Sequence, residues 1–370
     1  MEAADAEIVT RVPARLSQRI GGHDNNFNLI RATTALLVLI SHSFVVVTGL
    51  PSTEPLRQSF GLTLGSSAVD VFFIVSGLLV TRSVVTHDNA FSFVSARLLR
   101  VWPGLAVSLV LVAYVLGPVV TNLTLPAYLS STQTLAYVAR GVVFKLAEEF
   151  SRLPGVFTVT PHPGTVNVSL WTLPIEIRMY AYLLALWLAT RLARLRKMEA
   201  FNAAVALAFT FYAVRHFMAW HGAVEWSPHR LPFMFFTGAV MSILASRIVL
   251  SRSAAAVAAV ALLGAGWIGG PTFFVVYSLT LAYLVLCLAY LPAGRARRYN
   301  ATGDYSYGLY IYAWPVQQAL IFGLPGVSIP VHIALSIAVT LPLAMASWHL
   351  VEKPATTLQL AWRRRLLAAT

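Results

Sequence analysis

The feature that most constrains this chain is a succession of apolar runs, each long enough for a helix to cross a bilayer, which takes about 20 residues. Hydrophobic residues make up 58% of the 370 residues and charged residues only 11%, too few to cover the surface of a soluble protein. We therefore predict an all-α fold, a polytopic transmembrane bundle of about ten spans. The runs lie near residues 28–48, 66–84, 101–120, 169–190, 200–219, 230–250, 254–270, 272–292, 305–323 and 329–350.

The distribution of basic residues indicates the orientation of these spans. Ten spans place both ends of the chain on one side of the membrane, and most lysines and arginines then fall on that side. Cytoplasmic loops carry such an excess of positive charge, so we expect both termini in the cytoplasm. The formal net charge of +13 therefore indicates loop charge and lipid contact, not a nucleic-acid partner. We expect an integral protein of a bacterial cytoplasmic (inner) membrane.

Three segments follow from this topology. Residues 1–27 are polar and basic and lack the apolar core of a cleavable signal peptide, so we expect a cytoplasmic N-terminal segment. Residues 28–356 form one transmembrane domain, and residues 357–370 a basic cytoplasmic tail. The longest loop, 121–168, is external and holds four prolines, so it is not one continuous helix. Within it, residues 128–147 have the pattern of an interfacial helix.

Two polar residues share one face of the first predicted span. Arg31 and His42 are eleven residues apart, close to three full helical turns, which separates them by about 16 Å along the axis. Arg31 then lies near the cytoplasmic end and His42 in the outer half. A lone histidine inside a membrane is most often a helix–helix hydrogen bond. The arginine in register with it favours a functional site.

Two acids lie at the depth of His42 in other spans. Asp70 and Glu176 are expected roughly 6–11 Å below the outer ends of the second and fourth spans. Together with His42 they would form a buried proton-handling cluster, in which a carboxylate fixes the tautomer of the imidazole. The spacing leaves open which acid contacts His42. A structural ion pair between helices is the alternative for each acid, and no metal site is predicted.

A second polar centre is expected at the cytoplasmic face. Arg97 and Arg100 are three residues apart and so neighbours at the entry to the third span. With Arg31 they suit the binding of phosphates, because guanidinium groups make forked hydrogen bonds to them. Ordinary positive-inside charge or contact with lipid headgroups is the alternative. An enzyme that takes a phosphorylated donor from inside and serves an acceptor outside would need both centres.

At these residues the chain resembles the acyltransferase 3 family of integral membrane O-acyltransferases, from about residue 27 to 356. The resemblance rests on the order and spacing of seven sequence elements more than on any one of them. Ala313 departs from the pattern, since many members have histidine there. The matching elements are Phe27–His42, VDVFFIVSGLLV (69–80), FVSARLLRVWP (93–103), SLWTLPIEIRMY (169–180), RLPFMFFTGAV (230–240), GDYSYGLYIYAWPVQ (303–317) and SWHLVEKPA (347–355).

The resemblance implies a chemistry for these positions. It implies an acyl-CoA donor, usually acetyl-CoA, bound from the cytoplasm as a substrate. It makes His42 the catalytic base, places Glu176 at the acidic position and assigns Arg31, Arg97 and Arg100 to the CoA. Asp70 stays a second candidate for the catalytic acid because of its depth in the second span. The expected acceptor is a surface polysaccharide, lipopolysaccharide or lipid-linked glycan. A proton-coupled secondary transporter or lipid flippase is the alternative function, and the oligomeric state stays open.

Overall fold

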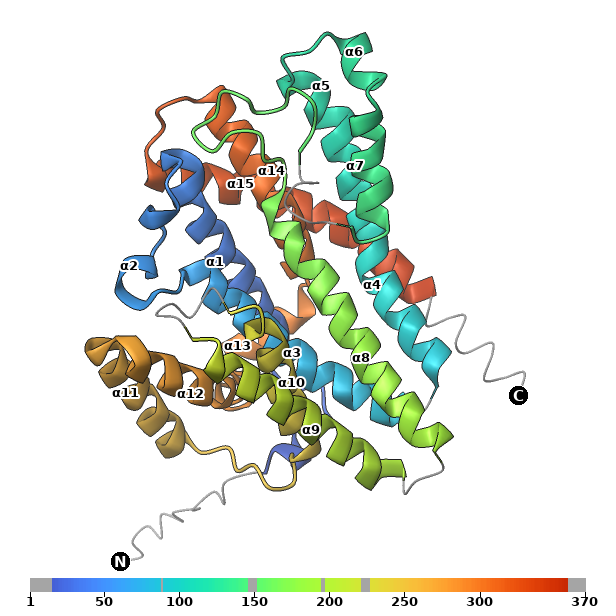
Figure 1. Ribbon diagram of the computed structural model, residues 1–370, viewed down its shortest axis with the longest axis vertical. Coiled ribbons are helices and arrows are strands. Elements are labelled where there is room, and N and C mark those ends of the chain that lie inside the picture. Colours follow the sequence, from blue (N-terminus) through green and yellow to red (C-terminus); the bar gives the residue numbers. More distant parts are fainter. Residues whose placement is uncertain (1–14, 88, 146–151, 194–196, 221–226, 359–370) are drawn as a thin grey trace, which may run out of the picture.

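The computed structural model of the chain describes residues 15–87, 89–145, 152–193, 197–220 and 227–358 (Figure 1). Within these ranges the secondary structure is helical, apart from two isolated backbone bridges, so the predicted all-α class is confirmed. Most of the predicted N-terminal segment and tail lies outside the described residues. The main helices are α1 (Phe27–Thr48), α3 (Leu64–His87), α4 (Ala90–Leu111), α8 (Thr172–Leu192), α9 (Lys197–Met218), α10 (Arg230–Ile243), α11 (Arg252–Ile268), α12 (Gly270–Tyr290), α14 (Ser306–Gly323) and α15 (Ile329–Ser347).

Each of the ten predicted spans overlaps one of these helices, although the third, 101–120, covers only the second half of α4 and the sixth, 230–250, runs past the end of α10. Five helical stretches are long and apolar enough to cross a membrane by length and composition: Phe27–Thr48, Leu64–Thr86, Ala90–Val120, Gly270–Tyr290 and Ile329–Leu358. The chain is therefore an integral membrane protein. The number of ten spans and the cytoplasmic position of both termini stay predictions.

The closest helix crossing joins α3 to α10. Gly77 of α3 faces the backbone of Phe235, and Gly238 of α10 faces the backbone of Ile74. A Cβ atom at either glycine would collide with a backbone oxygen, so only glycine lets the two helices approach this closely. This crossing turns one face of α3 toward α10. The remaining faces of α3 pack against α1, α4 and α8, the helices that line the cavity described below.

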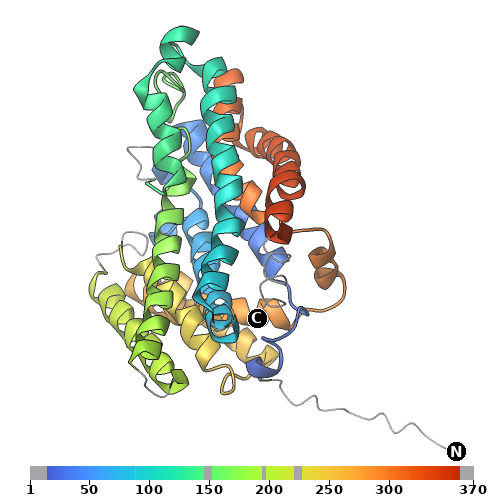
Figure 2. The same ribbon diagram turned by 90° about the vertical axis from the view of Figure 1, so that its right-hand side faces the viewer.

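Helix α4 continues into a column that rises above the rest of the molecule. It passes through a π-helical turn, η3 (Val112–Leu116), into α5 (Gly117–Val120), and then α6 (Leu125–Leu129) and α7 (Thr132–Val142) fold back beside it (Figure 2). The hydroxyl of Tyr128 donates to the carbonyl of Ala113 within the π-helical turn. The indole of Trp102 donates to the carbonyl of Val142. The helix expected within residues 128–147 is thus present as α7, and it packs along α4.

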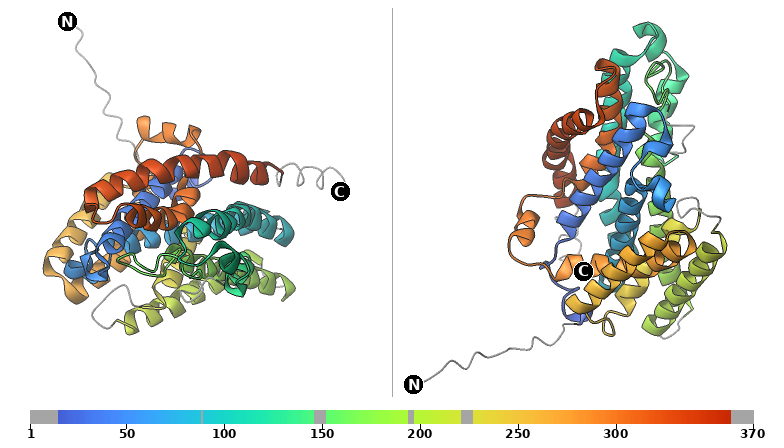
Figure 3. Two further views of the ribbon diagram at one scale, coloured as in Figure 1. Left: turned by 90° about the horizontal axis from the view of Figure 1, so that it is seen from above. Right: turned by 90° about the vertical axis from the view of Figure 1, so that its left-hand side faces the viewer.

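The chain enters the bundle through residues 162–169, here called the strap, a segment of bends and turns whose last two residues begin the 3-10 helix η5 (Val168–Trp171). The strap runs antiparallel to α14, whose side chains donate to its carbonyls: Tyr310 to Ser169 at 2.7 Å, Trp314 to Thr165 at 3.3 Å and Gln318 to His162 at 2.7 Å. Buried backbone needs such partners because it has no water. Seen from above, α15 lies toward one side of the molecule and α9 toward the other (Figure 3).

Candidate active site

The helices α1, α3, α4, α8 and α14 surround a cavity of about 320 Å³. Most of its polar lining comes from α1, α4, α8 and α14, whereas most of the residues contributed by α3 are apolar. The predicted residues Arg31, Arg97, Arg100 and Glu176 all line it. The other lining residues are Val69, Phe72, Phe73, Val75, Ser76, Leu79, Val80, Ala96, Val101, Thr172, Leu173, Tyr180, Ser306, Tyr307, Tyr310 and Thr356.

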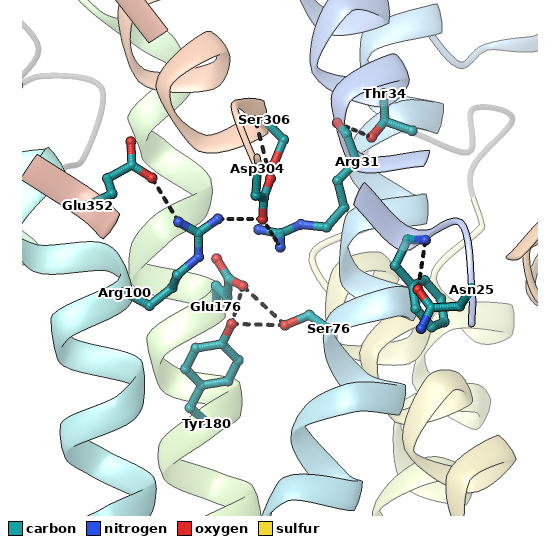
Figure 4. A network of polar contacts seen from close by, with 11 residues as sticks. Asn25, Arg31, Thr34, Ser76, Arg100, Glu176, Tyr180, Asp304, Ser306 and Glu352 are labelled. Carbon is teal, nitrogen blue, oxygen red and sulfur yellow. Dashed lines mark hydrogen bonds and ion pairs between the residues drawn. The ribbon is translucent and has the colours of Figure 1, made fainter. Parts of the chain in front are cut away.

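Two arginines of the cavity belong to one network of ion pairs (Figure 4). Arg31 contacts the carboxylate of Asp304 at 2.5 Å, and Arg100 contacts the same oxygen at 2.6 Å. Arg100 also contacts Glu352 at 2.7 Å, and Ser347 donates to the other oxygen of Glu352 at 3.0 Å. The sequence reasoning brought the arginines together correctly but missed both acids. Asp304 and Glu352 stand in the GDYSYG and SWHLVEKPA motifs, which would have been the signal to find them.

Asp304 lies in the turn before α14 and is charged because of its partners. Burial by itself raises the pKa of this carboxyl, but the guanidinium groups of Arg31 and Arg100, together with hydrogen bonds from Ser306, lower the pKa to about 2. The hydroxyl of Ser306 donates to its second oxygen at 2.5 Å. Asp304 is thus an anionic anchor that holds two arginines of the cavity lining, one from α1 and one from α4.

The third arginine, Arg97, differs from the other two. Its guanidinium lies 5.9 Å from the ring centroids of both Phe93 and Tyr180. In the described part of the chain it has no ion pair, and its buried Nε has no hydrogen-bond partner. Cation–π contacts leave the N–H groups free to donate, so Arg97 presents a donor group at the cavity that no protein carboxylate occupies.

Glu176 lines the same cavity as the three arginines and is drawn close to Arg100 in Figure 4. The hydroxyl of Ser76 donates to its carboxylate at 3.1 Å, and the hydroxyl of Tyr180 donates to the same oxygen. Sequence reasoning placed Glu176 near His42 on depth alone. The structure instead places it in the arginine centre, because the side chain points across the bundle toward α3 and α4 and not upward along α8.

Asp70 occupies a different environment, on the face of α3 that packs against α10. Its carboxylate pairs with Arg230 at 2.7 Å and accepts a hydrogen bond from Tyr277 of α12, also at 2.7 Å. The side chains of Asp70 and Arg230 are 0% and 2% exposed. This arrangement matches the alternative of a structural ion pair between helices, since Asp70 does not line the cavity.

His42 lies beyond the cavity, between α14 and the strap. Its Nδ1 is 3.5 Å from the hydroxyl of Ser169, and its ring meets the indole of Trp314 edge to face at 4.9 Å. The ring of His162 contacts the same indole at 5.4 Å. The expected single cluster of His42, Asp70 and Glu176 is therefore spread over three places. The polar partner that the structure gives His42 is Ser169, which no sequence argument had singled out.

This geometry provides the parts for acyl transfer. A partly buried imidazole with one nitrogen held by a hydroxyl can act as a base or a nucleophile through the other. An arginine centre about 16 Å away along the same helix face suits a phosphorylated donor. Among the described residues no group of three or more histidine, cysteine or acidic side chains could hold a metal ion.

Comparison with known proteins shows the family of the chain. The acyltransferase domain family matches residues 24–349, and the chain belongs to this acyltransferase family. The chain is 28% identical over 349 residues to the O-acetyl transferase of Shigella phage Sf6, covering 89% of this chain and 95% of that protein. It is 27% identical over 390 residues to Nodulation protein 10 of Rhizobium leguminosarum bv. viciae, covering 95% and 98%. No solved structure matches it. The protein is thus an acyltransferase enzyme of the membrane.

Proposed function

We propose that this enzyme is an O-acetyltransferase that moves an acetyl group from acetyl-CoA, bound from the cytoplasm, to a hydroxyl of a glycan or glycolipid on the other side of the membrane. The observation that carries the proposal is the cavity lined by three arginines, of which Arg31 lies on α1, on the helix face that also holds His42. The similarity to an O-acetyl transferase supports acetyl as the group and a hydroxyl as the acceptor.

The arginine centre is proposed to bind the phosphates of CoA. Arg97 is the most available of the three, because its guanidinium has no carboxylate partner to displace among the described residues. Arg31 and Arg100 are fixed by Asp304 and Glu352 and would donate through their remaining N–H groups. The apolar wall of α3, including Val75 and Leu79, suits the uncharged arm of the donor.

His42 is proposed as the catalytic base. It takes the proton of the acceptor hydroxyl as the hydroxyl oxygen bonds to the thioester carbonyl carbon. The carbon–sulfur bond then breaks, and CoA leaves as a thiolate that takes up a proton. In the other route, His42 is acylated first and passes the group to the acceptor. In either route the hydroxyl of Ser169 fixes the tautomer of His42. Glu176 lies in the cavity proposed to bind the donor, and Asp70 holds α3 against α10 through its ion pair with Arg230.

The acceptor is proposed to be a surface polysaccharide, a lipopolysaccharide or a lipid-linked glycan. The membrane is proposed to be the bacterial cytoplasmic membrane, with both termini inside. The excess of basic residues on one side of the predicted spans supports this orientation, in which the arginine centre would face the cytoplasm and His42 would lie nearer the outside.

The test is transfer of radiolabelled acetyl from acetyl-CoA in membranes of the encoding strain, with its own copy deleted and each variant supplied at matched levels. Wild type should label a glycan or glycolipid fraction, and His42→Ala should lower the rate by roughly 10²–10⁴-fold, the usual contribution of a general base. His332→Ala, which changes a buried histidine outside the site, is the control. Equal transfer by wild type and His42→Ala would remove His42 from the mechanism. Proton-dependent uptake without transfer would favour a transporter.

A further inference from the structure

We propose that Phe72 of α3 and Tyr310 of α14 form a constriction between the arginine-lined cavity and His42, and that its width sets the length of the acyl group transferred. This inference rests on the proposed function, since it assumes that an acyl thioester occupies the cavity. Both rings line the cavity and meet edge to face, with centroids 6.0 Å apart and planes at 69°.

The position of Phe72 follows from the face of α1 that it covers. Arg31 and His42 share this face, and Ala35 lies one turn beyond Arg31 toward His42. Phe72 packs against the buried cluster that contains Ala35 and Leu309. We therefore place the phenyl ring of Phe72 beside the route along α1 from the arginine centre to His42.

The position of Tyr310 is fixed by hydrogen bonds. Its hydroxyl lies 2.6 Å from the hydroxyl of Thr172 and donates to the carbonyl of Ser169 at 2.7 Å. Ser169 is also the residue whose hydroxyl contacts Nδ1 of His42 at 3.5 Å. Tyr310 thus has the cavity on one side and the residue that contacts His42 on the other.

The two halves of the constriction differ in how they are held. Tyr310 is buried and held by two polar contacts, whereas Phe72 is half-buried and held by apolar packing alone among its described contacts. Shortening Phe72 should therefore widen the passage without moving Ser169 or His42. A pocket that meets an acyl chain discriminates one methylene by roughly 10- to 200-fold. The wild-type constriction should pass acetyl and hinder longer groups.

The test compares acetyl-CoA, propionyl-CoA and butyryl-CoA as donors in the same membranes, with rates given as kcat/KM. Wild type should prefer acetyl, and Phe72→Ala should raise the butyryl-to-acetyl ratio at least about tenfold. The matched control is Val71→Ala, which also shortens a half-buried apolar side chain of α3, next to Phe72, but does not line the cavity. It should leave the ratio unchanged.

Two further variants keep the test decisive if Phe72→Ala fails to fold. Phe72→Leu should give an intermediate ratio, and Phe72→Trp should lower the rate with butyryl-CoA further. An unchanged ratio in the Phe72 variants, or an equal change in Val71→Ala, would overturn the constriction while leaving acyl transfer intact. No transfer by wild type from any of the three donors would overturn the proposed function itself.

Discussion

The two faces of α3 both carry polar groups inside the bundle, yet the structure uses them differently. Toward α10, Asp70 is sealed with Arg230 and Tyr277, and the ion pair has almost no exposed surface. Toward the cavity, Ser76 contacts Glu176 in a network that keeps space beside it for another molecule. A charged residue inside a membrane protein is thus not functional by burial alone; what decides is whether its partner closes the site or leaves room for a substrate.

The largest effect expected from this comparison is on stability. Asp70→Asn leaves the buried charge of Arg230 without its carboxylate, which should cost roughly 3–5 kcal/mol of unfolding free energy. Thermal unfolding of the detergent-solubilised protein would measure it. The double variant Asp70→Leu/Arg230→Leu removes both charges and should recover much of the loss. Normal stability of Asp70→Asn together with a lost pH dependence of transfer would instead make Asp70 part of the chemistry.

The next effect separates the cavity from the sealed face. Arg97→Ala removes a donor group without breaking an ion pair, so it should raise the KM for acetyl-CoA roughly 10- to 100-fold and leave stability nearly unchanged. The control is Arg178→Ala, an exposed arginine on α8 that should change KM less than twofold. A drop in stability with an unchanged KM would show that Arg97, like Arg230, is structural.

The smallest effect concerns the charge of the cavity network. Because the pKa of Asp304 is lowered to about 2 from an ordinary 3.8, its charge stabilises the fold fully above pH 4, and this stabilisation is lost as the pH falls toward 2. In Asp304→Asn, the free energy of unfolding should fall by roughly 2 kcal/mol less than in wild type as the pH is lowered from above 4 toward 2. The decline is measured as the unfolding midpoint against pH, with Asp24→Asn, an exposed ion-pair carboxylate, as the control. The same decline in wild type and Asp304→Asn would contradict the assignment.

Sequence patterns predicted most of the scaffold because helices in a bilayer satisfy their own backbone. The long apolar runs fixed where helices form, and the spacing of Arg31 and His42 fixed their shared face. The pairing of Arg97 and Arg100 with Arg31 around one cavity was also predicted. Depth along a span, however, says nothing about which way a side chain points around its helix, and so Asp70 and Glu176 were grouped with His42.

Contacts between distant segments were beyond the sequence. Ser169 reaches His42 only because α14 binds the strap through Tyr310, Trp314 and Gln318. Asp304 joins Arg31 and Arg100 across more than two hundred residues of chain. By itself the sequence determined the membrane-spanning, all-helical class and the chemical groups available, because hydrophobicity and helical period are local properties. Only the tertiary structure decided which charges are neutralised and which face a cavity, because that depends on how α1, α3 and α14 are rotated against one another.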